Sequence, residues 1–232
     1  MIHFPLFTRA RILLNKGGSS SSIYSYNSAS LWLKTNSSYS SQKSAAARNV
    51  LSAAAVPSSH SQSHAGSIWA LQIRCSEYSE YIHKFIGGKC PTVDFSESKK
   101  NMNVVLEIIE NELIKSAHDC SKGGLAVAVS ELCMTNLIGC TVSLESVPGD
   151  KLDHDKILFS ESHSRYLVTF EKKNIQNLEE LLKKHNVTFK IIGEFGGESI
   201  KFTADSKPII DLSVDKTQKT WLNSLKEMVM HA

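Results

Sequence analysis

Apolar residues recur at helical or strand-like spacing only in the later part of the chain, from about Ser76 onward. The first such pattern predicts an amphipathic helix over residues 103–116, with Val104 and Ile108 on its apolar face. A second apolar helix is expected directly after Gly123 and Gly124, because a nearly continuous apolar run follows these two residues.

Short strands and helices alternate through the rest of the chain. Period-two patterns predict strands at residues 140–144, 165–170, 189–194, 199–202 and 208–212. A third helix is expected over residues 175–185, and a last one from Asp215, with Trp221 in the core. Five strands and four helices over about 155 residues predict a single α+β domain with its own core.

The front of the chain has a different composition. Residues 1–76 contain nineteen Ser, seven Lys or Arg and no Asp or Glu, whereas residues 77–232 hold all 23 acids against 19 Lys or Arg. An ordinary soluble segment of 76 residues carries about nine acids. A Ser-rich, low-complexity stretch such as residues 1–76 buries too little apolar surface to offset its chain entropy. We therefore predict that residues 1–74 are a low-complexity, Ser-rich, disordered segment and that residues 75–232 form the domain.

Three interpretations of this front segment stay open. In the first, the segment is simply disordered or is not an evolved domain at all. In the second it is a targeting segment, and in the third it binds nucleic acid. An acid-free stretch rich in Arg and Ser over residues 1–60 is typical of an organelle transit peptide. A basic arm for nucleic acid is the third possibility, but seven charges over 76 residues make a poor patch, so no nucleic-acid partner is expected.

Two further classes of protein are disfavoured. No apolar run approaches the roughly 18 residues of a membrane span, so no membrane partner is expected. The cysteines are odd in number and form no C-x-x-C pair, which favours reduced thiols over a disulfide framework or a zinc knuckle. They are Cys75, Cys90, Cys120, Cys133 and Cys140.

The first candidate site is a loop-to-helix junction at residues 118–125. Free N–H groups at such a helix start attract anions, above all phosphate. The phosphate-binding candidates here are Ser121, Gly123 and Gly124, and Asp119 is a candidate magnesium ligand beside them. In the alternative interpretation, Ser121 caps the helix and the two glycines permit tight packing.

The second candidate site is the polar loop at residues 159–165, directly before a predicted strand. Glu161, Ser162 and His163 offer a carboxylate, a hydroxyl and an imidazole to a polar substrate. The alternative is a solvated loop with an ion pair between Arg165 and Glu161, which is worth little stability. No Walker loop, G-x-S-x-G elbow, H-E-x-x-H or dinucleotide fingerprint is present, and no catalytic residue is assigned.

Together these residues resemble a known family. The string from His118 to Ala128, with Ser130 and Glu131 behind it, is similar to the C-terminal domain of phosphoribosylformylglycinamidine synthase, large (synthetase) subunit. Further matches are Ser76-Glu77-Tyr78, with Cys75 in place of the family's glycine, the loop at residues 158–162 followed by Arg165, the Ile192-Gly193-Glu194 string and the Trp221 helix. Lys122 departs from the family, which usually has Asp there.

The resemblance implies a fold and an activity. The fold is α+β, a mixed sheet covered by helices, like the C-terminal domain of aminoimidazole ribonucleotide synthase-type proteins. The activity is that of an ATP-dependent carbon–nitrogen ligase of purine biosynthesis, which uses magnesium and converts formylglycinamide ribonucleotide to the amidine. By this resemblance Asp119 aligns with a magnesium position of the family's first repeat, and Glu161, Ser162 and His163 align with its substrate-contacting loop.

The resemblance also implies partners and an incomplete catalyst. The family chain fuses two copies of an ATP-binding half and a partner half, and this sequence resembles only the last partner half. The short form of the family works in the cytoplasm with a separate glutaminase subunit, a small bridging subunit and a phosphorylated ribonucleotide substrate. We expect this chain to be inactive alone and to bind ATP and magnesium weakly. A non-catalytic binding or subunit-packing module and a non-functional gene fragment stay open as alternatives.

Overall fold

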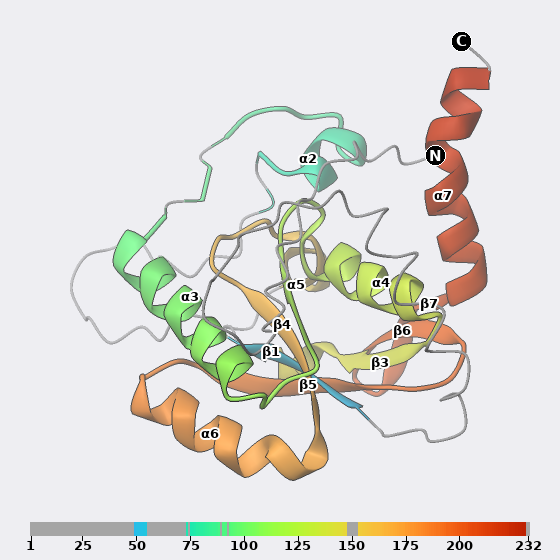
Figure 1. Cartoon of the computed structure of the whole chain (residues 1–232). Coiled ribbons are helices and arrows are strands. Elements are labelled where there is room, and N and C mark those ends of the chain that lie inside the picture. The colour runs from blue at the N-terminus through green and yellow to red at the C-terminus, as the bar shows by residue number, and fades with distance from the viewer. Residues whose placement is uncertain are drawn as a thin grey trace. The chain divides into compact units, whose positions relative to one another are not determined.

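The computed structural model describes residues 49–54, 73, 75–88, 90–91, 93–147 and 153–230. These residues build a seven-stranded mixed sheet in the order β2-β4-β1-β5-β3-β6-β7 (Figure 1). β3 and β6 are parallel, and every other neighbouring pair is antiparallel. The strands are β1 Asn49–Ala54, β2 Ser116–Asp119, β3 Cys140–Ser143, β4 Tyr166–Glu171, β5 Phe189–Phe195, β6 Ser199–Ala204 and β7 Lys207–Ser213.

Helices pack on both faces of this sheet. The helices are α2 Glu77–Tyr81, α3 Phe95–Glu110, α4 Gly124–Asn136, α5 His154–Phe159, α6 Ile175–Lys184 and α7 Val214–Met230. Because successive strand side chains point to opposite faces, β4 serves two cores: Leu167 joins one, while Val168 and Phe170 join the other. The predicted fold class, α+β with a helix-covered mixed sheet, is confirmed.

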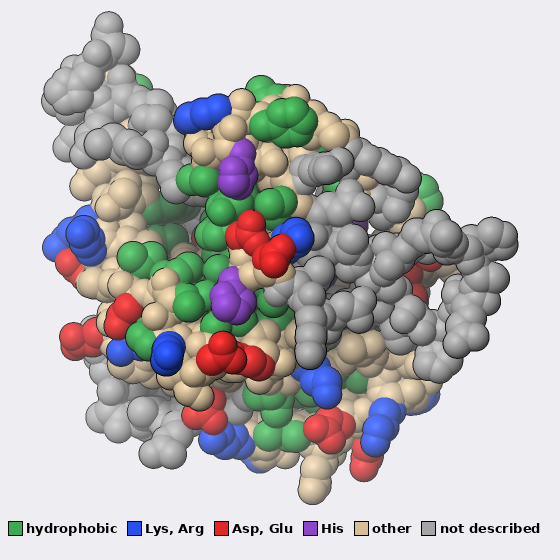
Figure 2. All heavy atoms as spheres, turned by 180° about the vertical axis from the view of Figure 1, so that it is seen from behind, with side chains coloured by type: hydrophobic (Ala, Val, Ile, Leu, Met, Phe, Trp, Pro, Cys, Tyr) green, Lys and Arg blue, Asp and Glu red, His purple; other side chains and the backbone are tan. Residues whose placement is uncertain are grey.

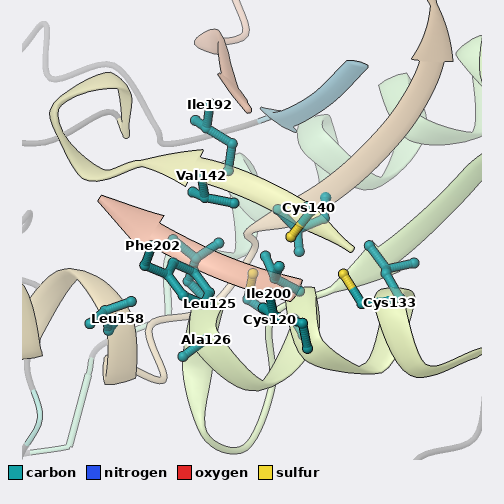
Figure 3. Packing of buried hydrophobic residues seen from close by; sticks show 14 of the residues in the cluster. Cys120, Leu125, Ala126, Cys133, Cys140, Val142, Leu158, Ile192, Ile200 and Phe202 are labelled. Carbon is teal, nitrogen blue, oxygen red and sulfur yellow. The ribbon is translucent and has the colours of Figure 1, made fainter. Parts of the chain in front are cut away.

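The larger core lies between α4, α5 and the strands β3, β5 and β6. Its members include Leu125 and Leu158 from the helices, and Val142 and Phe202 from the strands, and Figure 3 shows how they interdigitate. The smaller core packs α3 and α6 on β4 through residues such as Ile108, Leu178 and Phe170. The continuous apolar run of α4 and the apolar periodicity of α6 were therefore correct guides to burial.

The first long helix occupies a different stretch from the one predicted. α3 spans Phe95–Glu110 and begins at Asp94, whose side chain accepts a hydrogen bond from the backbone N–H of Glu97 at 2.9 Å. This N-cap stabilises a first turn that has no apolar periodicity of its own. The predicted range of residues 103–116 was wrong at both ends, and its last residue already belongs to β2.

Two strands were missed by the sequence analysis. β2 includes His118 and Asp119, which were expected in a loop, and it is paired only with β4. β1 lies between β4 and β5, within residues 1–74 that were predicted to be disordered. For these six residues the structure differs from the predicted disorder, because the backbone of β1 pairs with a strand on each side. Residues 1–48 and 55–72 lie outside the described residues.

The last helix is less buried than predicted. Trp221 was expected in the core, but it is 43% exposed, and Leu222 and Val229 are exposed too. Gln218 fixes the first half of α7 to α4 by donating to the Met134 carbonyl at 2.8 Å, and the second half extends past α4 in Figure 1. No described helix, α7 included, has both the length and the apolar content needed to cross a membrane.

Candidate functional site

Glu161 joins the start of α4 to the start of α2. Its Oε1 atom accepts hydrogen bonds from the backbone N–H of Gly123 at 2.9 Å and from the backbone N–H of Glu77 at 3.0 Å. Helix starts carry unpaired N–H donors and about half a positive charge, which a carboxylate stabilises. The anion at the predicted phosphate site is therefore a side chain of the protein itself.

Lys122 is also paired within the protein. Its Nζ lies 2.6 Å from Oε1 of Glu77, whose side chain is largely buried. The hydrogen bond to Glu77 is the main reason that the pKa of Lys122 lies above its ordinary value, and the charge of Glu161 adds to it. The ammonium group is thus paired with one carboxylate and stabilised by the charge of a second, so Lys122 adds less attraction for an external phosphate than its charge alone suggests.

The two glycines at this junction have different roles. Gly123 is the N-cap of α4 with φ of 75°, a left-handed conformation that glycine adopts readily. Gly124 lies against the backbone end of α5: a Cβ at this position would meet the carbonyl oxygens of Ser160 at 2.5 Å and Leu158 at 2.8 Å. The packing interpretation therefore holds for Gly124. The expectation that Ser121 caps the helix was wrong, because α4 has no side-chain cap.

The loop before β4 is organised around Arg165, which is only 7% exposed. Its guanidinium donates to the backbone carbonyls of Ser160 and Ser162, and its own carbonyl accepts from the Cys120 N–H at 2.9 Å. The ion pair expected between Arg165 and Glu161 is replaced by these backbone contacts. Arg165 therefore holds the loop in the shape that aims Glu161 at the two helix starts.

The remaining candidates of this loop are arranged differently. Ser162 forms a hydroxyl–hydroxyl contact with Ser160 at 2.8 Å, and His163 is exposed. Ser164 is tied to α3 through Ser98 and Asn101. The structure thus brings Glu161 to Gly123, but it gives Ser162 and His163 no contact to the α4 start that would make them a joint site.

Asp119 does not fit a magnesium site in the described part of the chain. Its side chain is 56% exposed, and its Oδ1 atom lies 4.0 Å from Nδ1 of His118. Among the described residues no three His, Cys, Asp or Glu side chains come together as metal ligands. Magnesium prefers several oxygen ligands in octahedral geometry, which one exposed carboxylate beside an imidazole does not supply.

A partly buried His–Glu pair links β2 to α4, and no pattern in the sequence assigned it a role. His118 Nε2 lies 2.7 Å from Oε2 of Glu131, and both side chains are at most 25% exposed. Burial opposes protonation of the ring, but the hydrogen bond and charge of Glu131, with help from Asp119, outweigh it and raise the pKa of His118. The two residues are 13 positions apart on different elements, so only the tertiary structure reveals the pair.

The His118–Glu131 pair predicts a pH-dependent stability. Because the pKa of His118 is raised in the folded state, its contribution is fully present below the unfolded value of about 6.5 and is lost as pH rises through the folded pKa. We expect Glu131→Gln to remove this pH dependence and to lower the histidine pKa. Urea unfolding at several pH values and the NMR titration of the His118 ring measure both effects. A wild-type ring that titrates below 6.5 would contradict the assignment.

Charges on the described surface are mixed. Several ion pairs join two exposed side chains, for example Lys172 with Glu194 and Lys219 with Asp215. On the face shown in Figure 2, basic and acidic side chains are interspersed. A hollow of about 530 Å³ lies over β3 and β5, lined by residues such as Thr141 and Glu194, and none of the predicted site residues contributes to it.

The fold and the string at the α4 start define the class of this protein. Residues 64–205 match the family described as AIR synthase related protein, C-terminal domain, and the chain belongs to this family. The match begins eleven residues before the domain boundary predicted from the sequence. The resemblance identified from residues 118–131 is thereby confirmed.

Two curated relatives are PurL subunits of phosphoribosylformylglycinamidine synthase. The chain is 32% identical over 155 residues to phosphoribosylformylglycinamidine synthase subunit PurL of Alkaliphilus metalliredigens, covering 67% of this chain and 20% of that protein. It is 40% identical over 116 residues to PurL of Thermococcus gammatolerans, covering 50% of this chain and 16% of that protein. The chain therefore spans about a fifth of the length of the curated relatives it matches.

Solved structures show the same fold. PurL of Thermotoga maritima complexed with FGAR matches with a TM-score of 0.59 and 20% identity, covering 73% of this chain and 28% of that one. The same protein complexed with ATP matches with a TM-score of 0.54 and 20% identity, covering 73% of this chain and 25% of that one. At this identity the similarity concerns the fold alone.

Proposed function

We propose that this chain acts as the second partner half of a phosphoribosylformylglycinamidine synthase large subunit. In that role it contributes to the ATP-dependent conversion of formylglycinamide ribonucleotide to formylglycinamidine ribonucleotide in purine biosynthesis. The observation that carries the proposal is the match to PurL proteins over two thirds of this chain and one fifth of theirs. A cytoplasmic location and partnership with a glutaminase and a small bridging subunit follow from the same family role.

The geometry of the α4 start supports a structural rather than a catalytic part in this reaction. Glu161 accepts the hydrogen bond of the Gly123 N–H, and Glu77 forms an ion pair with Lys122. The polar groups of the site are therefore already paired within the protein. The residues around Asp119 do not fit magnesium, and no step of the reaction is assigned to a metal here. ATP and magnesium would be held by the ATP-binding half of the assembled enzyme.

The test compares the isolated chain with a chimera. The isolated chain, mixed with ATP, magnesium, ammonium and formylglycinamide ribonucleotide, should release no phosphate above a protein-free control. Replacing the matching segment of the Alkaliphilus relative by residues 64–232 should retain amidine formation, whereas deleting that segment should abolish it. Substrate-dependent turnover by the isolated chain, or a folded chimera as inactive as the deletion, would refute the proposal.

The candidate phosphate site makes a separate prediction. Glu161→Ala removes the internal carboxylate and frees the N–H groups of Gly123 and Glu77, so ADP should bind about tenfold more tightly than to the wild type. Lys122→Asp should weaken binding, and added salt should weaken it in every variant. Titrations followed by amide chemical shifts near residues 119–126 measure this.

The matched control for this titration is Glu179→Ala. Glu179 is an exposed residue of α6, away from the α4 start, and its loss changes the net charge by the same amount. Equal tightening in both variants would assign the effect to net charge. Unchanged affinity in Glu161→Ala would leave tight packing as the function of this junction.

A further inference from the structure

Two exposed thiols flank the short helix α2. Cys75 precedes the helix and Cys90 follows the loop after it, and both are exposed free cysteines. The Cys75 Sγ donates to the carbonyl of Gly88 at 3.3 Å across 13 residues. The Cys75 thiol also forms a side-chain hydrogen bond with Cys90, which raises its pKa. The segment therefore returns on itself and brings its two ends together.

Backbone contacts hold this segment in place without any covalent link. The carbonyl of Ser79 accepts from the N–H of Phe85 at 3.1 Å and from that of His83 at 3.2 Å, which turns the chain back after α2. The three other cysteines, Cys120, Cys133 and Cys140, are buried in the larger core. Cys75 and Cys90 are thus the two exposed cysteines of the described residues, and the Cys75 thiol lies 3.3 Å from the carbonyl of Gly88, two residues before Cys90.

We propose that Cys75 and Cys90 form a reversible disulfide that closes the segment around α2, with a disulfide such as oxidised glutathione as the oxidant. One cysteine thiolate attacks a sulfur of glutathione disulfide, forms a mixed disulfide and expels a glutathione thiolate. The second cysteine thiolate attacks the protein sulfur of that mixed disulfide and expels the other glutathione. The two cysteine protons pass to the glutathione thiolates, so two protein thiols are oxidised and one glutathione disulfide is reduced.

The bridge would restrict the opening of the segment around α2, which contacts the start of α4. In the reduced chain, this five-residue helix is attached there by the N–H of Glu77 on Glu161 and by the Glu77–Lys122 pair. A helix this short opens readily by itself. Closing the loop removes many of the open conformations. Trypsin cleavage after Lys84, an exposed residue within the loop, should therefore slow about tenfold on oxidation.

The experiment equilibrates the full chain in glutathione buffers of increasing oxidised fraction, followed by acid quenching, alkylation and mass spectrometry. The expected product is a linked pair of peptides carrying Cys75 and Cys90, while Cys120, Cys133 and Cys140 react only after unfolding. Cys75→Ser and Cys90→Ser should each carry one glutathione on the remaining exposed cysteine. The slower cleavage after Lys84 should appear in the oxidised wild type and in neither variant.

Three outcomes would overturn the proposal. Separate glutathione adducts on Cys75 and Cys90 of the wild type would show that the thiols cannot reach each other. A bridge from either residue to a buried cysteine would show that another pairing is preferred. A Cys75–Cys90 bridge that leaves cleavage after Lys84 unchanged would show that the disulfide does not restrain α2.

Discussion

Replacing Ala53 by proline should cost about 3 kcal/mol of unfolding free energy, because the substitution removes a donor from the middle of the sheet. Ala53 lies in β1 opposite Leu167 of β4 and Lys190 of β5, so both sides of its backbone face a neighbouring strand. Proline is found on edge strands and not at such positions. Urea unfolding followed by circular dichroism measures the loss.

The matched control is a proline at Ser20, in the segment that the sequence predicts to be of low complexity. This variant should stay within about 0.5 kcal/mol of the wild type. Chains that begin at residue 49 and at residue 75 extend the comparison, since the second lacks β1. If both truncated chains unfold at the same urea concentration, β1 is dispensable and the boundary predicted at residue 75 is correct.

Gly124→Ala should destabilise the protein by roughly 2–4 kcal/mol. The added Cβ would lie 2.5 Å from the carbonyl oxygen of Ser160 and 2.8 Å from that of Leu158, and neither backbone atom can rotate away. Gly124 also has a φ of 64°, which alanine adopts at a cost. The substitution must therefore push α4 away from the end of α5, which opens the larger core.

Gly197→Ala separates the steric clash from the backbone strain in the stability loss expected for Gly124→Ala. Gly197 has a similar φ of 72°, but no atom lies within 4 Å of its added Cβ. Its substitution should therefore cost only the conformational strain, about 1 kcal/mol. The difference between the two variants measures the clash at the α4–α5 contact. Equal losses would show that the close packing of Gly124 adds nothing to stability.

The α4 start shows how far local sequence reasoning reaches in the candidate site. The run from His118 to Leu125 correctly indicated a glycine-rich entry into a buried helix, because those features are local in sequence. The side chain that accepts hydrogen bonds at this helix start was not predictable. Glu161 lies 38 residues from Gly123 and 84 from Glu77, and no spacing rule connects positions that meet only through the packing of α5 against α4.

The sequence by itself determined the elements with a strong internal pattern. α6, with Leu178 and Leu182 on one face, and the strands β3 to β7 were found within one or two residues of their observed bounds. Their side-chain periodicity reports burial directly, because apolar residues recur every 3.6 residues on the buried face of a helix and every second residue on a buried face of a strand. The family string at residues 118–131 is likewise contiguous, so its residues alone are enough to recognise it.

Only the tertiary structure decided the elements and contacts that depend on distant partners. β1 has no alternation of apolar and polar residues, and β2 has a single apolar residue. Both are strands because β4 and β5 supply their hydrogen-bond partners. The same holds for the His118–Glu131 pair and for the approach of Cys75 to Cys90. The physical reason is that each of these features depends on contacts between different elements of the chain, which the side-chain pattern within one element does not encode.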